Sequence, residues 1–319
     1  MRVKVSTPAR LHLGIIDMKG DLGRIYGSVG VAINKPRTII TVEQSNKLVV
    51  EGVCAKRATD FTKLMLKQLN IDSYVRIKIT SASPTHVGLG SGTQLALAIG
   101  RAICEVFRID MTVEEIAKVM RRGSISGIGI YAFKYGGFIV DGGRKEGNRE
   151  IPPLLFRYDF PKDWYFVVCI PHIEREIHGN LEERLMSSVH QSLKDHFPGD
   201  QARIVLIKLL PSLIERDIQS FGEALTRLQI EVGKVFSVVQ GGTFRDPIIE
   251  KGVKLMLNCG AYGAGQSSWG PAFYGLVEGE KEAEKLVKKM EEFLKEHVGG
   301  DVFYVTADNE GAKIENNPL

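Results

Sequence analysis

Cysteine is scarce in this chain of 319 residues, and its few copies are scattered. The four cysteines, at positions 54, 104, 169 and 259, include no C-x-x-C pair. This spacing excludes a zinc knuckle and a compact disulfide framework. Because nothing in the pattern calls for an oxidising compartment, we expect a cytoplasmic protein.

Long apolar runs are also missing from the sequence. No stretch reaches the roughly 18 consecutive apolar residues that a membrane-spanning helix needs. The first residues, MRVKVSTPARLHLG, lack the apolar core of a secretory signal. We therefore expect no membrane partner.

A strong charge imbalance is absent from the chain as a whole, although not from its halves. The 42 Lys and Arg residues against 38 Asp and Glu residues give a net charge of +4, too small a surplus to indicate nucleic-acid binding. Residues 1–160, however, contain 24 basic and 14 acidic side chains, whereas residues 161–319 contain 18 and 24. We therefore expect an anionic ligand to bind mainly to the first half.

The remaining composition is that of an ordinary folded protein, and its patterns predict an α+β fold. The length predicts about two domains, which we place at residues 1–160 and 161–319. Predicted strands of the first half are Arg2–Thr7, Ile39–Val42, Lys47–Glu51 and Tyr74–Thr80, and predicted helices are Thr59–Leu69, Thr93–Phe107 and Met111–Arg122. In the second half, strands Trp164–Ile170 and Val302–Thr306 flank predicted helices Leu181–His196, Gln201–Leu210, Leu213–Phe236 with a break near Gly222, Pro247–Leu257 and Glu280–His297.

A glycine-rich loop between a predicted strand and a predicted helix, PTHVGLGSGTQ at 84–94, is the sharpest motif. Glycines let backbone N–H groups approach an anion, and the start of a helix favours negative charge. The residues assigned to phosphate or pyrophosphate binding are Gly88, Leu89, Gly90, Ser91, Gly92, Thr93 and Gln94. The motif is neither G-x-x-x-x-G-K-[ST] nor G-x-G-x-x-G, so a glycine turn without a ligand is the alternative interpretation.

Two further segments accompany this loop: PARLHLG at 8–14 and GAYGAGQSSWG at 260–270. In this order the three segments resemble the GHMP kinase superfamily of galacto-, homoserine, mevalonate and phosphomevalonate kinases. The resemblance implies a GHMP-kinase-like two-domain fold with the ligand in the cleft between the domains.

The chain departs from the kinase pattern where the kinases carry phosphoryl-transfer groups. Gly92 replaces the second serine of the phosphate loop, and S-G-x-D becomes Ser126-Gly127-Ile128-Gly129, without a carboxylate. The strings GRIYGSVGVAI, GLGSGTQLALAIG, SGIGIYAFKYGGFIVDGG and GAYGAGQSSWGPAFYGL instead resemble the family of β-ribofuranosylaminobenzene 5′-phosphate synthases, archaeal enzymes of methanopterin biosynthesis.

This narrower resemblance implies a phosphoribosyl pyrophosphate-dependent, decarboxylating pentosyltransferase. Such an enzyme condenses phosphoribosyl pyrophosphate with 4-aminobenzoate or 4-hydroxybenzoate, releases CO2 and pyrophosphate, and leaves a β-C-riboside 5′-phosphate. It also implies Mg2+ as the cofactor and a homodimer. Two other hypotheses stay open: an ATP-dependent small-molecule kinase of the same fold, and a ligand-binding protein that has lost its chemistry.

Charge type and position within these motifs select the remaining candidates. We expect Arg10 and Arg24 to donate charged hydrogen bonds to phosphates, and Asp17 to bind the metal or to stabilise the cationic sugar. Asp141 is the second metal candidate, with a turn-shaping role as its alternative. The expected substrate-pocket residues are His12, Ser126, Gly127, Gly265, Gln266, Ser267, Ser268 and Trp269, among which His12 and Trp269 have packing as the alternative role.

Overall fold

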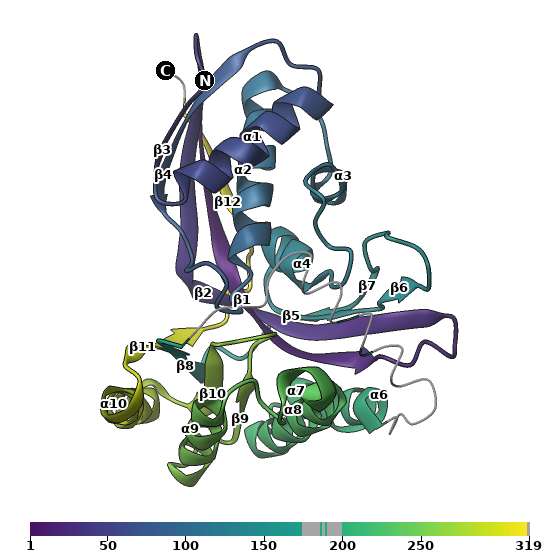
Figure 1. Ribbon diagram of the computed structural model, residues 1–319, viewed down its shortest axis with the longest axis vertical. Coiled ribbons are helices and arrows are strands. Elements are labelled where there is room, and N and C mark those ends of the chain that lie inside the picture. Colours follow the sequence, from purple (N-terminus) through teal and green to yellow (C-terminus); the bar gives the residue numbers. More distant parts are fainter. Residues whose placement is uncertain (174–185, 187–188, 190–199, 318–319) are drawn as a thin grey trace.

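The computed structural model describes residues 1–173, 186, 189 and 200–317. Two sheets form its framework, each covered by helices on one face (Figure 1). The α+β architecture expected from the sequence is therefore present. The predicted helix Leu181–His196 lies outside the described residues, apart from positions 186 and 189.

The first sheet has the strand order β12-β1-β2-β4-β3, with three short strands joined to it through β2. Its strands are β1 (Arg2–Asp17), β2 (Arg24–Ser45), β3 (Val49–Gly52), β4 (Tyr74–Ser81), β5 (Phe138–Asp141), β6 (Arg144–Lys145), β7 (Leu154–Tyr158) and β12 (Lys313–Asn317). All pairs are antiparallel except β3 with β4. The helices α1 (Ala55–Gln68), α2 (Ser91–Phe107), α3 (Val113–Val119) and α4 (Ile128–Tyr135) lie on one side of it (Figure 1).

The strand β2 is much longer than the predicted strand Ile39–Val42, because the glycines near its start are typical of turns. Residues 25–33 are buried throughout, so the alternation of polar and apolar residues that reveals a strand is missing there. Gly30 shows why small residues are used: a Cβ at this position would lie 2.3 Å from the Ile128 side chain of α4. The helix α4 was not predicted, because the glycines at and around Ile128–Tyr135 obscure the helical pattern in the sequence.

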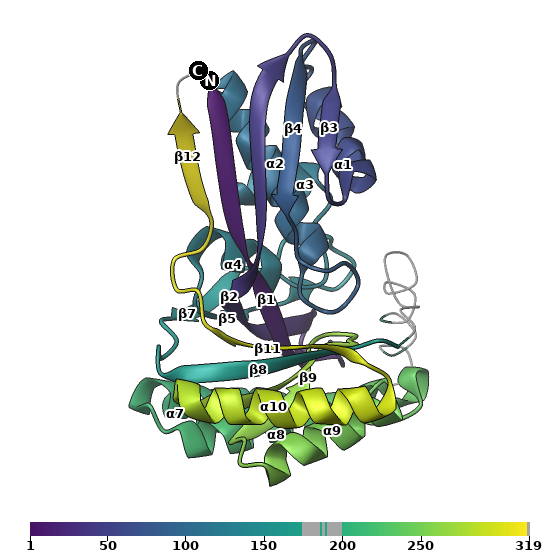
Figure 2. The ribbon, with the colours of Figure 1, turned by 90° about the vertical axis from the view of Figure 1, so that its left-hand side faces the viewer.

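The second sheet has the order β11-β8-β10-β9 and is antiparallel throughout. Its strands are β8 (Trp164–Pro171), β9 (Gly263–Gln266), β10 (Phe273–Glu278) and β11 (Gly300–Thr306). Along β8, Phe166 and Val168 face the core shared with β1 and β2, whereas Val167 and Cys169 face α9 and α10, as the two-residue period of a strand requires. The second sheet thus lies between the first half and its own helices (Figure 2).

The helices of the second half are α6 (Asp200–Ile204), a π-helical turn (Val205–Leu209), α7 (Leu210–Glu215), α8 (Ile218–Gln240), α9 (Pro247–Asn258) and α10 (Glu280–His297). The predicted break near Gly222 is wrong: the helix is interrupted at Arg216, and Asp217 caps the start of α8 by accepting a hydrogen bond from Ser220 N–H. Gly222 lies inside α8, and the position requires glycine because a Cβ there would be 2.2 Å from the Tyr262 carbonyl oxygen. It serves close packing, not a turn.

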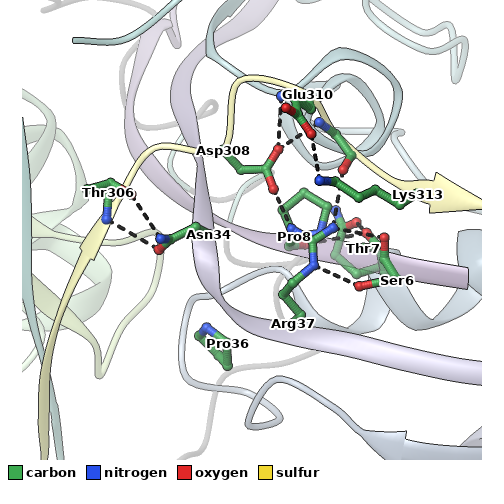
Figure 3. Close-up of polar contacts among 12 residues, drawn as sticks. Ser6, Thr7, Pro8, Asn34, Pro36, Arg37, Thr306, Asp308, Glu310 and Lys313 are labelled. Carbon is green, nitrogen blue, oxygen red and sulfur yellow. Dashed lines mark hydrogen bonds and ion pairs between the residues drawn. The ribbon is translucent and has the colours of Figure 1, made fainter. Parts of the chain in front are cut away.

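The last strand, β12, returns to the first sheet and pairs with β1. A division at residue 160 therefore leaves β12 in the opposite half of the chain from its own sheet. Figure 3 shows contacts between the two halves: Arg37 forms an ion pair with the buried Asp308, and Asn34 Nδ2 donates to Thr306 Oγ1 at 2.9 Å. Contacts of this kind lock the two halves together.

Candidate active site

A cavity of about 850 Å³ is lined by residues from both halves of the chain. Its described wall contains five cationic side chains and three aromatic rings, but no Asp or Glu. The cations are Arg10, Lys118, Arg121, Arg122 and Arg149, and the rings are Phe236, Phe244 and Trp269. The cations all come from the first half and the rings all come from the second. We call the part of the wall formed by the first half its cationic side and the part formed by the second half its aromatic side.

Arg10 lies where β1 passes the glycine loop. Its N–H donates to Leu89 O at 3.2 Å, and its guanidinium donates to Gly88 O at 2.5 Å. Gly90 gives this side chain room, since a Cβ there would lie 3.0 Å from Arg10 Cγ. The predicted neighbourhood of Arg10 and the loop is therefore present, and it brings a positive charge close to the start of α2.

The loop itself is held by the second half of the chain. Gly88 has a φ of +89°, and a Cβ there would be 2.2 Å from the Ser267 carbonyl oxygen, so only glycine fits. Ser267 Oγ donates to Gly88 O at 2.7 Å and accepts from His12 N–H at 3.0 Å. Ser267 therefore fastens β1 and the loop to each other, which is a structural role within the predicted pocket.

The seven predicted phosphate-binding residues differ in what their side chains do. Leu89 is packed in the core. Gln94 is buried, donating to Gly129 O at 2.7 Å and accepting from the Thr7 hydroxyl. Thr93 lines the cavity. A phosphate contact from Leu89 or Gln94 would therefore have to come from the backbone.

Gly92, which replaces the kinase serine, lies against a cation that sequence reasoning missed. A Cβ at Gly92 would be 2.4 Å from Arg57 Nη2, so the absent side chain leaves room for this guanidinium at the start of α2. Burial lowers the pKa of Arg57. Two guanidinium groups lie within cation–π distance of the Phe61 ring, Arg57 at 5.7 Å and Arg122 at 4.9 Å from its centre.

Asp17 and Arg24 lie beyond the described cavity wall. Asp17 follows the lining residue Ile15 by two positions, and its carboxylate accepts from Lys19 N–H at 2.8 Å. The Arg24 guanidinium donates to the carbonyl oxygens of Gly142 and Gly143 at 3.0 and 2.8 Å. Their catalytic roles stay predictions.

Asp141 is fully buried and organises the chain around it. Its carboxylate accepts from Ser28, Gly127 and Gly143 N–H groups at 3.1, 2.8 and 3.0 Å. Burial raises its pKa to about 6, against the lowering effect of these hydrogen bonds. It therefore fixes the turn that carries Ser126, a residue of the cavity wall.

His12 lines the cavity but is a poor candidate for proton transfer. Burial, and to a smaller extent the charge of Arg10, lower its pKa to about 3. The imidazole is therefore neutral near pH 7. It can shape the wall or offer a hydrogen bond, but it carries no charge.

The predicted pocket residues of the second half fall into two groups. Gln266, Ser268 and Trp269 line the cavity, as Ser126 does on the other side. Trp269 packs edge-on against Phe236 with ring centres 4.9 Å apart, so it combines packing with a place in the wall. Gly265 lies behind the wall, where a Cβ would be 2.3 Å from Gln229.

Sequence reasoning missed two sets of lining residues. One face of α8 contributes Gln229, Val232, Gly233, Phe236 and Gln240. Their spacing of three and four is visible in the sequence, but it looks the same as core packing. Lys118 and Arg149 come from segments far apart in the chain, and only the basic surplus of residues 1–160 hinted at them.

Two kinds of site are not found among the residues that the structure describes. No three His, Cys, Asp or Glu side chains there lie close enough together to hold a metal ion. None of the described helices is long and apolar enough to cross a membrane.

Comparison with known families and solved structures agrees with this architecture. The GHMP kinases N terminal domain model matches residues 54–137, and the GHMP kinases C terminal model matches residues 209–296. Among solved structures, L. major mevalonate kinase in complex with R-mevalonate has a TM-score of 0.73 at 18% identity over 97% of this chain and 96% of its own. Homoserine kinase from Cytophaga hutchinsonii has a TM-score of 0.65 at 18% identity, over 98% and 97%. These two likenesses concern the fold alone.

Sequence relatives are more specific. A β-ribofuranosylphenol 5′-phosphate synthase of Methanocaldococcus jannaschii is 33% identical over 97% of this chain and 99% of its own length. The protein of the same name from Archaeoglobus fulgidus is 34% identical, over 86% and 88%. The resemblance expected from the motifs is thus confirmed, and the chain belongs to the β-ribofuranosylphenol 5′-phosphate synthase family, built on the GHMP kinase fold.

Proposed function

We propose that this enzyme joins phosphoribosyl pyrophosphate to 4-hydroxybenzoate, forming a β-C-riboside 5′-phosphate and releasing CO2 and pyrophosphate. The observation that carries the proposal is the divided cavity, with five cations and no described carboxylate on one side and aromatic rings on the other. The relatives are named for a ribofuranosylphenol. Since a phenol product requires a hydroxylated acceptor, we favour 4-hydroxybenzoate over 4-aminobenzoate.

The cationic side suits a sugar that carries both a phosphate and a diphosphate. Arginine guanidinium groups give strong, directional hydrogen bonds to phosphate oxygens. Arg10 lies beside the glycine loop, and Arg121, Lys118 and Arg149 add positive charge along the same side. A carboxylate in this wall would repel the leaving pyrophosphate, and the described wall has none.

The reaction begins at the anomeric carbon of the sugar. The bond from this carbon to pyrophosphate breaks, pyrophosphate keeps the electron pair, and the sugar acquires oxocarbenium character. Arg10, Thr93 and the backbone N–H groups at the start of α2 stabilise the departing anion. Phe236 and Trp269 hold the ring of the acceptor against the sugar.

Carbon–carbon bond formation then uses electrons of the ring. The ring carbon that bears the carboxylate attacks the anomeric carbon, and the ring temporarily loses its aromaticity. The bond to the carboxylate breaks, CO2 departs, and its electron pair restores the ring. Because the carboxylate is already ionised and the phenol keeps its proton, no general acid or base is needed, which agrees with the neutral state of His12.

Magnesium stays a proposal that comes from the family resemblance. No three His, Cys, Asp or Glu side chains of the described residues lie close enough together to hold the ion. Asp17 remains the first candidate for a metal or sugar contact, and Asp17→Asn is expected to depress turnover far more than thermal stability. Turnover within twofold of the wild type would remove Asp17 from the site.

A labelled acceptor tests the proposed reaction. The protein is incubated with magnesium, phosphoribosyl pyrophosphate and carboxyl-labelled 4-hydroxybenzoate, and in parallel with ATP and a panel of alcohols. We expect one labelled CO2 for each pyrophosphate released. Consumption of ATP without labelled CO2 would instead support the kinase hypothesis, whose relatives are homoserine kinases at 24–26% identity. A homodimer is also proposed from the resemblance, and solution scattering tests it.

A further inference from the structure

The last turns of α8 place a side-chain amide, that of Gln240, in the aromatic side of the cavity. Gln240 follows Phe236 by four residues, so the two side chains are neighbours on one face of the helix. Phe236 is the ring that packs edge-on against Trp269. The amide therefore lies beside the surface proposed to hold the acceptor ring.

Hydrogen bonds fix which end of this amide is left for a ligand. Gln240 Nε2 donates to Gly242 O at 3.0 Å and to Thr243 O at 2.9 Å. An amide nitrogen has two protons, so both are used. Within the described chain no donor reaches the carbonyl oxygen Oε1, which is a hydrogen-bond acceptor held in place by its own nitrogen.

The other two amides of the described wall differ from Gln240. Gln229 donates to a carbonyl oxygen of β1, and its oxygen accepts from Gln266 N–H at 2.8 Å. Gln266 accepts from Arg245 N–H at 3.0 Å and donates to a backbone oxygen at 2.9 Å. Both amides use their nitrogen and their oxygen in holding the backbone, whereas Gln240 uses only its nitrogen.

The geometry of the acceptor connects Gln240 to the reaction. In 4-hydroxybenzoate the attacking carbon and the hydroxyl lie at opposite ends of the ring. If the attacking carbon faces the sugar on the cationic side, the hydroxyl faces the side formed by α8. We infer that Gln240 Oε1 accepts a hydrogen bond from this para hydroxyl, an inference that rests on the proposed function and assigns the residue that recognises its acceptor.

The proposed bond also acts on the rate. When the new carbon–carbon bond forms, positive charge spreads through the ring to the para oxygen, and its O–H becomes a stronger donor. The bond to Oε1 is then stronger in the transition state than in the ground state, which is the condition for faster catalysis. No proton is transferred, because the departing CO2 returns the electron pair to the ring.

Comparison of two ligands isolates this bond from any structural role of Gln240. 4-Fluorobenzoate has nearly the shape of 4-hydroxybenzoate but no proton to donate. In Gln240→Met we expect kcat/KM for 4-hydroxybenzoate to fall about tenfold, the loss of one hydrogen bond made by a charged transition state. The inhibition constant of 4-fluorobenzoate against this substrate should change less than twofold.

One more variant completes the test. Gln219→Met, at an exposed position of α8, should change neither constant. Equal shifts of both constants in Gln240→Met, or no shift in either, would overturn the inference. A wild-type enzyme that releases no labelled CO2 would instead refute the proposed function itself.

Discussion

The two sides of the cavity are built in different ways, and the difference concerns what each can tolerate. On the cationic side, Lys118 and Arg121 are exposed side chains at the end of a short helix, so they supply charge with little packing. On the aromatic side, Trp269 is 9% exposed and belongs to a buried cluster with Phe236. The charges of Lys118 and Arg121 can therefore be removed with little effect on the fold. The shape of the aromatic side, by contrast, depends on residues of the core.

The junction of the two sides should be the most sensitive point. In Gly88→Ala the new Cβ meets the Ser267 carbonyl oxygen, and the backbone must leave a left-handed conformation. We expect a loss of about 4 kcal/mol in the free energy of unfolding, measured by urea denaturation. Gly260→Ala is the control, because Gly260 also has a positive φ but nothing within 4 Å, and it should lose only about 1 kcal/mol. Equal losses would mean that the two sides are not tightly joined here.

Asp141 holds the turn that carries Ser126, and its contribution to the free energy of unfolding depends on pH. Its folded pKa of about 6 lies above the ordinary 3.8, so the native state binds the proton more tightly than the unfolded chain. Its stabilising contribution is complete below about pH 4 and is lost as the pH rises through about 6, a change of about 3 kcal/mol. Relative to Asp141→Asn, the wild type should lose that much unfolding free energy between pH 4 and pH 7.

The control for this titration has the opposite sign. Hydrogen bonds from Ser220 lower the pKa of the exposed Asp217, so its contribution is present at neutral pH and is lost as the pH falls. The difference in unfolding free energy between wild type and Asp217→Asn should therefore become smaller as the pH falls. If the difference in unfolding free energy between wild type and Asp141→Asn stays constant between pH 4 and pH 7, burial does not raise the pKa of Asp141.

Removal of charge from the cationic side should affect one substrate only. In Arg10→Ala we expect kcat/KM for phosphoribosyl pyrophosphate to fall about fiftyfold, or about 2 kcal/mol, because charged hydrogen bonds are lost. The KM for 4-hydroxybenzoate should change less than threefold. Arg76→Ala, on an exposed face of β4, controls for net charge. A parallel change in both substrates would contradict the division of the cavity.

Loss of a ring from the aromatic side should affect 4-hydroxybenzoate and leave the kinetics of phosphoribosyl pyrophosphate unchanged, and this is the smallest effect that we expect. In Trp269→Ala we expect the KM for 4-hydroxybenzoate to rise about fivefold, since an aromatic pair contributes about 1 kcal/mol. Trp269→Phe keeps a ring and should stay within threefold of the wild type. Steady-state kinetics with a melting curve for each variant separates binding from folding. A rise confined to phosphoribosyl pyrophosphate would reverse the assignment of the two sides.

Several elements were predictable because their signals are local. The amphipathic pattern of α10 and the capping box of Thr112 and Glu115 at the start of α3 involve residues within a few turns of each other. The glycine loop at 84–94 was also predictable, since several glycines between a predicted strand and a predicted helix form a local pattern. By contrast, β9 lies inside a segment that looked like a loop, because Gly263 and Gly265 are required by contacts with α8.

The sequence alone determined the fold family, the position of the glycine loop and the basic character of the first half, because each depends on residue type or short spacing. Tertiary structure decided which charges meet. It placed Arg57 where the kinase serine is missing, buried Asp141, and put Gln240 in the wall of the same cavity as the cations. These positions depend on contacts between segments far apart in the chain, and no local pattern encodes such distances.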